Sequence, residues 1–253
     1  MDEMFNRFHN ANLKTSLKAF NFGGDYLLTG CIGCGKTRIL SHLVKYFRKR
    51  GYLISGVIQP RVFLRNVECY VLVDIDYQLI LPFMLGVEVL KEFRKSELEE
   101  LFLPYLCYLK KFGFKFDFSN IERFRKWLVF NSSLEYINFK FDVCNIGVKV
   151  KDTPFNGIAF FYDEYGSFEE KGLVSFKKIL FFSEALRSMT YELQVDFKRF
   201  IIVRNELISQ TNFLDRYKSH IGDFVANIVG GDNCYELSNI LKKMGVEIVN
   251  GLD

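Results

Sequence analysis

The sequence predicts an α/β fold of three layers, in which helices cover both faces of a mostly parallel central sheet. Short apolar runs alternate along the chain with amphipathic stretches of helical period. The first apolar run leads through a glycine-rich turn into the first helix, and a second apolar run follows. This strand-turn-helix-strand pattern spans about thirty residues, the length of a βαβ unit. A β-hairpin and a helical insertion are expected within the same fold.

The first βαβ unit is the clearest part of the pattern. A strand over 26–29 precedes a turn over 30–35, and a second strand is expected over 53–58. Between them, apolar residues recur at helical spacing, and Gly51 follows a basic last turn as a helix stop. The apolar face of this helix consists of Ile39, Leu40, Leu43, Val44 and Phe47.

The remaining elements are less regular. A capping box of Ser119 and Glu122 predicts the start of one helix. Region 131–156 is ambiguous and is read as short strands. The other expected elements are a hairpin over 69–84 that turns near Asp76, a helical region over 87–111, strands over 158–162, 200–203, 224–229 and 246–249, and helices around 173–180 and 237–244.

Composition bounds the domain organisation. The chain has 253 residues, of which 49% are hydrophobic and 25% charged, as in an ordinary globular protein. We expect one domain over 1–253, with an N-terminal arm over 1–22 and an insertion over 85–157. The charged stretch 87–111 reads either as a lid over the site or, more simply, as a solvated surface.

Charge and cysteine content restrict location and partners. The net charge of +4 falls short of the basic footprint of a dedicated nucleic-acid domain. No signal peptide opens the sequence and no apolar run reaches about 18 residues, so the six cysteines are expected as free thiols of a cytoplasmic protein without a membrane anchor. A protein partner or a homo-oligomer remains open.

A phosphate-binding motif follows the first strand. Residues 30–37 read Gly-Cys-Ile-Gly-Cys-Gly-Lys-Thr, which matches the pattern G-x-x-x-x-G-K-[ST]. Glycines let backbone N–H groups turn toward phosphates, and the helix N-terminus adds positive potential. Lys36 is expected on the β- and γ-phosphates and the Thr37 hydroxyl on Mg²⁺. The predicted nucleotide-binding set is Gly30, Cys31, Ile32, Gly33, Cys34, Gly35, Lys36, Thr37 and Arg38.

Cys31 and Cys34 also form a C-x-x-C pair within this loop. Such a pair can be a redox couple or half of a metal site. No second C-x-x-C or histidine pair accompanies it in the sequence, so we favour the interpretation that both cysteines fill variable positions of the phosphate loop.

A phosphate loop requires a carboxylate at the end of a neighbouring buried strand to support Mg²⁺. Two apolar runs end in an acid, one at Asp74 and one at Asp163. The run to Asp74 continues into the predicted hairpin, whereas Asp163 is followed directly by Glu164. We favour Asp163 for the metal and Glu164 as the group that orients or deprotonates the attacking water.

Four blocks together resemble the small P-loop nucleoside-triphosphatases first recognised in thermophiles. The blocks are the loop with its extra Gly33 after Thr29-Gly30, Gly56-Val-Ile-Gln-Pro-Arg61, Asp163-Glu-Tyr-Gly-Ser-Phe-Glu169, and Val203-Arg204. They occur in the family's order over roughly half of the chain. Tyr165 and Glu170 depart from the family's usual aliphatic residues.

The resemblance implies a RecA-like core and Mg²⁺-dependent hydrolysis of ATP or another nucleoside triphosphate. Arg204, at a strand end, is a candidate for sensing or stabilising the γ-phosphate, whereas Arg61 is a weaker one. Two other functions remain open. A nucleotide or nucleoside kinase shares the phosphate loop, although no arginine-rich lid is evident between Gly166 and Phe200. A nucleotide-switch ATPase would act through a protein partner.

Overall fold

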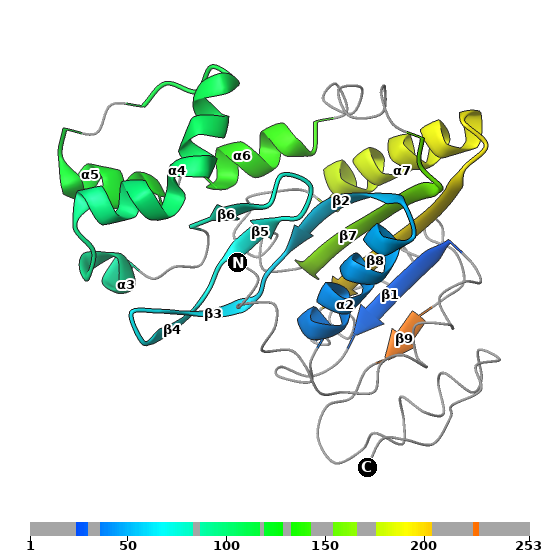
Figure 1. Cartoon of the computed structure of the whole chain (residues 1–253), viewed down its shortest axis with the longest axis horizontal. Coiled ribbons are helices and arrows are strands. Elements are labelled where there is room, and N and C mark those ends of the chain that lie inside the picture. The colour runs from blue at the N-terminus through cyan, green and yellow to red at the C-terminus, as the bar shows by residue number, and fades with distance from the viewer. Residues whose placement is uncertain are drawn as a thin grey trace, which may run out of the picture. The chain divides into compact units, whose positions relative to one another are not determined.

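The computed structural model describes residues 24–29, 36–82, 87–116, 119–128, 133–142, 154–165, 176–203 and 225–227 (Figure 1). The chain separates into two compact units. Unit 1 contains 1–54, 154–167 and 187–253, and unit 2 contains 55–153 and 168–186. Strand β2 (Tyr52–Ile58) and helix α7 (Phe176–Glu192) each run from one unit into the other. The expectation of a single domain stays a prediction.

The central sheet has the strand order β6-β5-β2-β7-β8-β1-β9. In unit 1, β7 (Gly157–Tyr165), β8 (Asp196–Val203), β1 (Asp25–Thr29) and β9 (Val225–Asn227) pair in parallel. Helix α2 (Lys36–Lys49) joins β1 to β2 and packs on β7 and β8 (Figure 1). A mixed α/β architecture with a mostly parallel central sheet is thereby confirmed.

A row of stacked aromatic rings fixes the register of these strands. Tyr26 of β1 stacks on Phe200 of β8 at 4.7 Å between ring centroids, and Phe161 of β7 stacks on the same ring at 5.0 Å. The ring of Phe47 of α2 lies 6.4 Å from that of Phe161 and 5.5 Å from that of Phe200, between centroids. Because a slip of one residue would move every side chain to the opposite face, this row locks three strands and one helix together.

Two glycines set the ends of elements in unit 1. Gly51 has φ of +74° directly after α2, the left-handed conformation that ends helices, as the sequence predicted. At Gly157, a Cβ atom would lie 2.5 Å from the carbonyl oxygen of Asp196 and 2.6 Å from the ring of Tyr52. Only glycine therefore lets β7 begin this close to β8.

Unit 2 contains antiparallel strands and helices. The second half of β2 pairs with β5 (Leu72–Asp74), which pairs with β6 (Leu79–Leu81), so the hairpin predicted to turn near Asp76 is confirmed. The helical region predicted over 87–111 forms two helices, α3 (Val87–Lys91) and α4 (Lys95–Lys111). Helices α5 (Ile121–Lys126) and α6 (Ser133–Lys140) follow.

Two expectations need correction, and one hairpin was not expected. Asn120, and not Ser119, caps α5, since its side chain accepts from the N–H groups of Glu122 and Arg123 at 2.9 and 3.2 Å. Region 131–156, read as short strands, contains α6. A second hairpin, β3 (Arg61–Leu64) with β4 (Val67–Tyr70), was not expected. Its turn places Arg65 and Asn66 at positive φ, and without the usual turn glycine it carries no strong hairpin signal.

Strands β7 and β8 extend beyond their predicted limits, and β9 lies within the predicted 224–229, of which the structure describes 225–227. The arm over 1–22, the helix at 237–244 and the strand at 246–249 lie outside the described residues.

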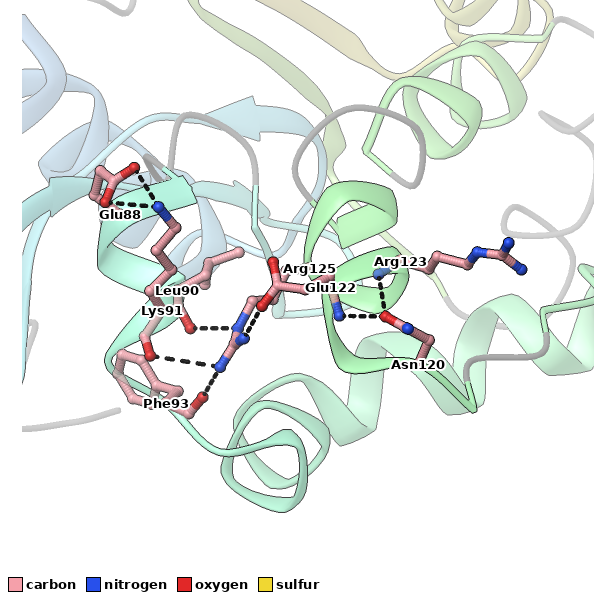
Figure 2. Close-up of polar contacts among 8 residues, drawn as sticks. All are labelled: Glu88, Leu90, Lys91, Phe93, Asn120, Glu122, Arg123 and Arg125. Atoms are coloured by element: carbon pink, nitrogen blue, oxygen red, sulfur yellow. Dashed lines mark hydrogen bonds and ion pairs between the residues drawn. The ribbon is translucent and has the colours of Figure 1, made fainter.

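Arg125 of α5 ties that helix to the end of α3 (Figure 2). Its Nε donates to the carbonyl oxygen of Leu90 at 3.0 Å, and its Nη2 donates to those of Phe93 at 2.6 Å and Lys91 at 3.4 Å. An ion pair also joins Arg125 Nη1 to Glu122 Oε1 at 2.5 Å. The last carbonyls of a helix have no partner within it, so this guanidinium satisfies the C-terminal end of α3.

We expect Arg125→Ala to lower the free energy of unfolding by about 2 kcal/mol, because charge-assisted bonds to three carbonyls are lost. Urea unfolding measures the effect. Arg123→Ala is the matched control: that side chain is exposed and points away from the cluster (Figure 2), so its loss should change stability by less than about 0.5 kcal/mol. Equal effects of the two substitutions would contradict this account.

Candidate functional site

The carboxyl ends of β1, β8 and β7 lie at one edge of the sheet. Leu28 is level with Ile202, and Ile201 is level with Tyr162. Thr29 follows Leu28 on β1, Val203 follows Ile202 on β8, and Asp163 follows Tyr162 on β7. Neighbouring strands are about 4.8 Å apart, so one strand separates the start of the phosphate motif from the acidic pair. Ligands of open α/β sheets bind at this kind of edge.

The register shifts at the acidic pair itself. Tyr162 is opposite Ile201 but Tyr165 is opposite Val203, so β7 has one residue more than β8 over this interval. Asp163 and Glu164 together face the single position of Ile202. An extra residue of this kind redirects side chains at the end of a strand and is frequent next to active sites.

Asp163 is fully buried at this edge. Its backbone and that of Glu164 belong to β7, but the Glu164 side chain lies outside what the structure describes. A carboxylate without exposure to water is costly unless hydrogen bonds, a cation or a metal compensate it. Burial thus supports a specific role for Asp163.

Helix α2 begins at Lys36, directly after the glycine-rich loop. Lys36 is only 5% exposed, and Thr37 is half-buried. The hydroxyl of Ser41 donates to the carbonyl oxygen of Thr37 at 2.9 Å, a bond that engages the main chain of Thr37 and not its hydroxyl.

The other predicted nucleotide ligands are not described. Residues 30–35 and Arg204 fall outside the described ranges, as does the side chain of Arg38. The weaker candidate Arg61 lies in the β3–β4 hairpin, where its guanidinium pairs with Glu68.

Asp74, the alternative metal carboxylate, already has partners for both oxygens. Its Oδ1 accepts from the N–H groups of Asp76 at 2.9 Å and Tyr77 at 3.2 Å. Its Oδ2 accepts from the Tyr136 hydroxyl and pairs with Lys140 Nζ at 2.8 Å. Asp74 ends an antiparallel strand and all these bonds are internal to unit 2, so its contacts favour a role in holding the fold together.

No pattern in the sequence indicated the cluster around Asp74. Lys140, with a side chain only 4% exposed, also pairs with Asp76 at 2.5 Å. Burial alone would lower the pKa of Lys140, but the two aspartates outweigh it and raise the pKa, so the ammonium stays charged. Burial and the Asp74 carboxylate also raise the pKa of Tyr136, which keeps its donor proton.

No family model and no curated protein matches this sequence.

A second buried charge cluster lies at the opposite edge of the unit 1 sheet. Arg199, with no exposure, donates from Nε to Asp25 Oδ1 at 2.8 Å, and Arg187 pairs with the other oxygen of Asp25. Burial and, less strongly, the carboxylates of Asp196 and Asp25 raise the pKa of Tyr26 to about 12. This cluster stands at the amino ends of β1 and β8, away from the phosphate motif, and therefore stabilises the fold.

Mg²⁺ is the metal that the sequence predicts. Among the described residues no three His, Cys, Asp or Glu side chains gather into a metal cluster. A magnesium site in a phosphate-loop protein requires no such cluster, because Mg²⁺ keeps waters and binds one or two protein oxygens with the phosphates. The Asp163 carboxylate and the Thr37 hydroxyl are hard oxygen donors of this type, so the residues present fit the metal.

Other expectations are tested only in part. Cys69 and Cys107 are free thiols, whereas Cys31, Cys34, Cys144 and Cys234 lie in undescribed segments. None of the described helices combines the length and apolar character needed to cross a bilayer.

Proposed function

We propose that the chain binds a nucleoside triphosphate with Mg²⁺ and hydrolyses it to the diphosphate and phosphate. One observation carries the proposal: the parallel register puts the end of β1, which precedes the motif in the sequence, and the buried Asp163 of β7 at the same edge of one sheet. A phosphate loop and an acidic strand end must meet in this way for a metal to connect them. Both groups belong to unit 1.

The phosphates would be held by the loop and the start of α2. A helix of 14 residues presents N–H groups and a partial positive charge at its N-terminus. Lys36, in the first turn and withdrawn from water, supplies a full charge for the β- and γ-phosphates. Glycines 30, 33 and 35 would let the main chain approach the phosphates closely.

The Thr37 hydroxyl and Asp163 would hold the metal. When bound, Mg²⁺ neutralises the charge that develops on the phosphate oxygens and orients the γ-phosphate. Glu164 follows Asp163 directly and would accept a proton from the attacking water or orient it. Arg204 follows Val203, the last residue of β8, in the sequence and would stabilise charge on the transferred group.

Strand order also favours the finer fold assignment, a three-layer P-loop fold with a RecA-like core. β1 lies inside the sheet between β8 and β9. The chain continues from β1 to one side, toward β2, and from β8 to the other side, toward β9. Adjacent strands that continue in opposite directions mark the crevice where α/β sheets bind nucleotides.

The test is phosphate release from ATP, GTP, CTP and UTP with Mg²⁺, together with nucleotide affinity, for the wild type and Glu164→Gln. We expect the wild type to release phosphate without an acceptor and the variant to bind with similar affinity but turn over at least about 100-fold more slowly. Glu169→Gln, in the same acidic block, is the matched control and should retain turnover.

Tight binding by the wild type without release would reject autonomous hydrolysis. The kinase and the partner-dependent switch would then be tested, by adding nucleoside acceptors and by seeking an activating protein. Absence of any nucleotide binding would reject the phosphate-loop assignment itself.

A further inference from the structure

Positive charge is concentrated in one part of the chain. Residues 26–67 contain no Asp or Glu and eight Lys or Arg, out of 34 basic and 30 acidic residues in the whole chain. The rest of the chain therefore carries 26 basic and 30 acidic residues and is net negative. The chain as a whole is weakly basic, but this segment is strongly basic. Binding of a nucleotide would explain only the cations at the start of the segment.

Four of these eight cations lie at the C-terminal end of α2, remote from the start of the helix where the phosphate motif ends. Lys45 is half-buried, and Arg48, Lys49 and Arg50 are exposed. The spacing of Lys45, Arg48 and Lys49 puts them on one side of the helix, over one turn. A helix of 14 residues is about 21 Å long, so this end, which we call the basic tip, is separate from the nucleotide site.

The main chain and one guanidinium of the basic tip are held in place. The Gly51 N–H donates to the Arg48 carbonyl oxygen at 3.1 Å, and Asn156 Nδ2 donates to the Arg50 carbonyl oxygen at 2.6 Å. The Arg50 guanidinium lies over the Tyr46 ring, 4.4 Å from its centroid. A planar guanidinium stacked on an aromatic ring is already ordered for bidentate contact with phosphate and for stacking on a base.

We propose that the basic tip, Lys45, Arg48, Lys49 and Arg50 with Tyr46, binds the phosphate backbone of single-stranded nucleic acid. A lipid surface fits less well, because the apolar face of α2 is buried in the core and offers nothing to insert. Over about 8 Å the tip spans two or three phosphates. Binding is therefore weak and sensitive to salt, in keeping with the modest net charge of the chain.

The experiment is fluorescence anisotropy of a labelled dT 20-mer with the full chain, from 50 to 200 mM NaCl without nucleotide. We expect a Kd of about 1–100 μM at the lowest salt. Log Kd should rise with log[NaCl] with a slope of about 1.5–2. Arg48→Gln, Lys49→Gln and Arg50→Gln combined should weaken binding at least about tenfold and flatten the slope. All three side chains are exposed, so unfolding midpoints should match those of the wild type.

The matched control removes the same charge from the end of another helix. Lys110→Gln, Lys111→Gln and Lys115→Gln combined act on three exposed lysines, two in the last turn of α4 and one four residues beyond it, and should leave affinity within about twofold. An equal loss in this control would mean that net charge alone binds the strand, and would overturn the proposal. Loss of binding in Lys36→Ala, or binding of anionic phosphatidylserine vesicles without binding of the dT 20-mer, would overturn it as well.

Discussion

Asp163→Asn should reduce Mg²⁺-dependent phosphate release at least about 100-fold, whereas Asp74→Asn should leave the rate per folded molecule nearly unchanged. Loss of a metal carboxylate removes charge stabilisation of several kcal/mol from the transition state, and each 1.36 kcal/mol is a factor of ten in rate. Asp74 is instead occupied by Tyr136, Lys140 and two backbone N–H groups. Its loss should lower the free energy of unfolding by about 3 kcal/mol.

The rate of phosphate release and the free energy of unfolding therefore distinguish Asp163 from Asp74, the two carboxylates that the sequence left as alternatives. Phosphate release at a series of Mg²⁺ concentrations and urea unfolding would be measured on the same samples. If Asp74→Asn abolished release while its unfolding midpoint stayed at the wild-type value, the metal assignment would pass to Asp74.

Asp25→Ala should lower the free energy of unfolding by about 3–5 kcal/mol, the largest stability effect expected in unit 1. The substitution leaves the fully buried guanidinium of Arg199 without its carboxylate, and arginine cannot escape this penalty by losing its proton. Chemical denaturation followed by circular dichroism measures the loss. Arg187, the second partner of Asp25, is 37% exposed and can turn to water.

Two further variants sharpen this experiment. Asp25→Leu combined with Arg199→Met should recover most of the loss, because a well-packed apolar pair replaces a buried ion pair at little cost. Glu68→Ala, which breaks the exposed pair with Arg61, is the surface control and should cost less than about 1 kcal/mol. A loss in Asp25→Ala no larger than that of the control would show that Asp25 does not compensate Arg199.

Much of the fold follows from local patterns. Helix α2 has a full apolar face, a basic last turn and a glycine stop, so its start and end agree with the structure. Strands β1 and β7 each contain a short apolar run, over 26–28 and 158–162. Where local signals were weak, tertiary contacts determined the secondary structure. Helix α6 contains few strong helix formers, and its Tyr136 and Lys140 are held by two aspartates from another element.

The sequence by itself predicted the chemistry of this chain: a phosphate-loop pattern after a strand, and two acidic strand ends that could serve a metal. Only the tertiary structure shows which of these carboxylates lies at the carboxyl end of a parallel strand and which already has partners within unit 2. The stacked rings of Tyr26, Phe200 and Phe161 fix the register that brings Asp163 level with the end of β1, and internal hydrogen bonds occupy Asp74. The physical reason is that strand partners, register and burial depend on contacts between residues far apart in sequence, which no local pattern encodes.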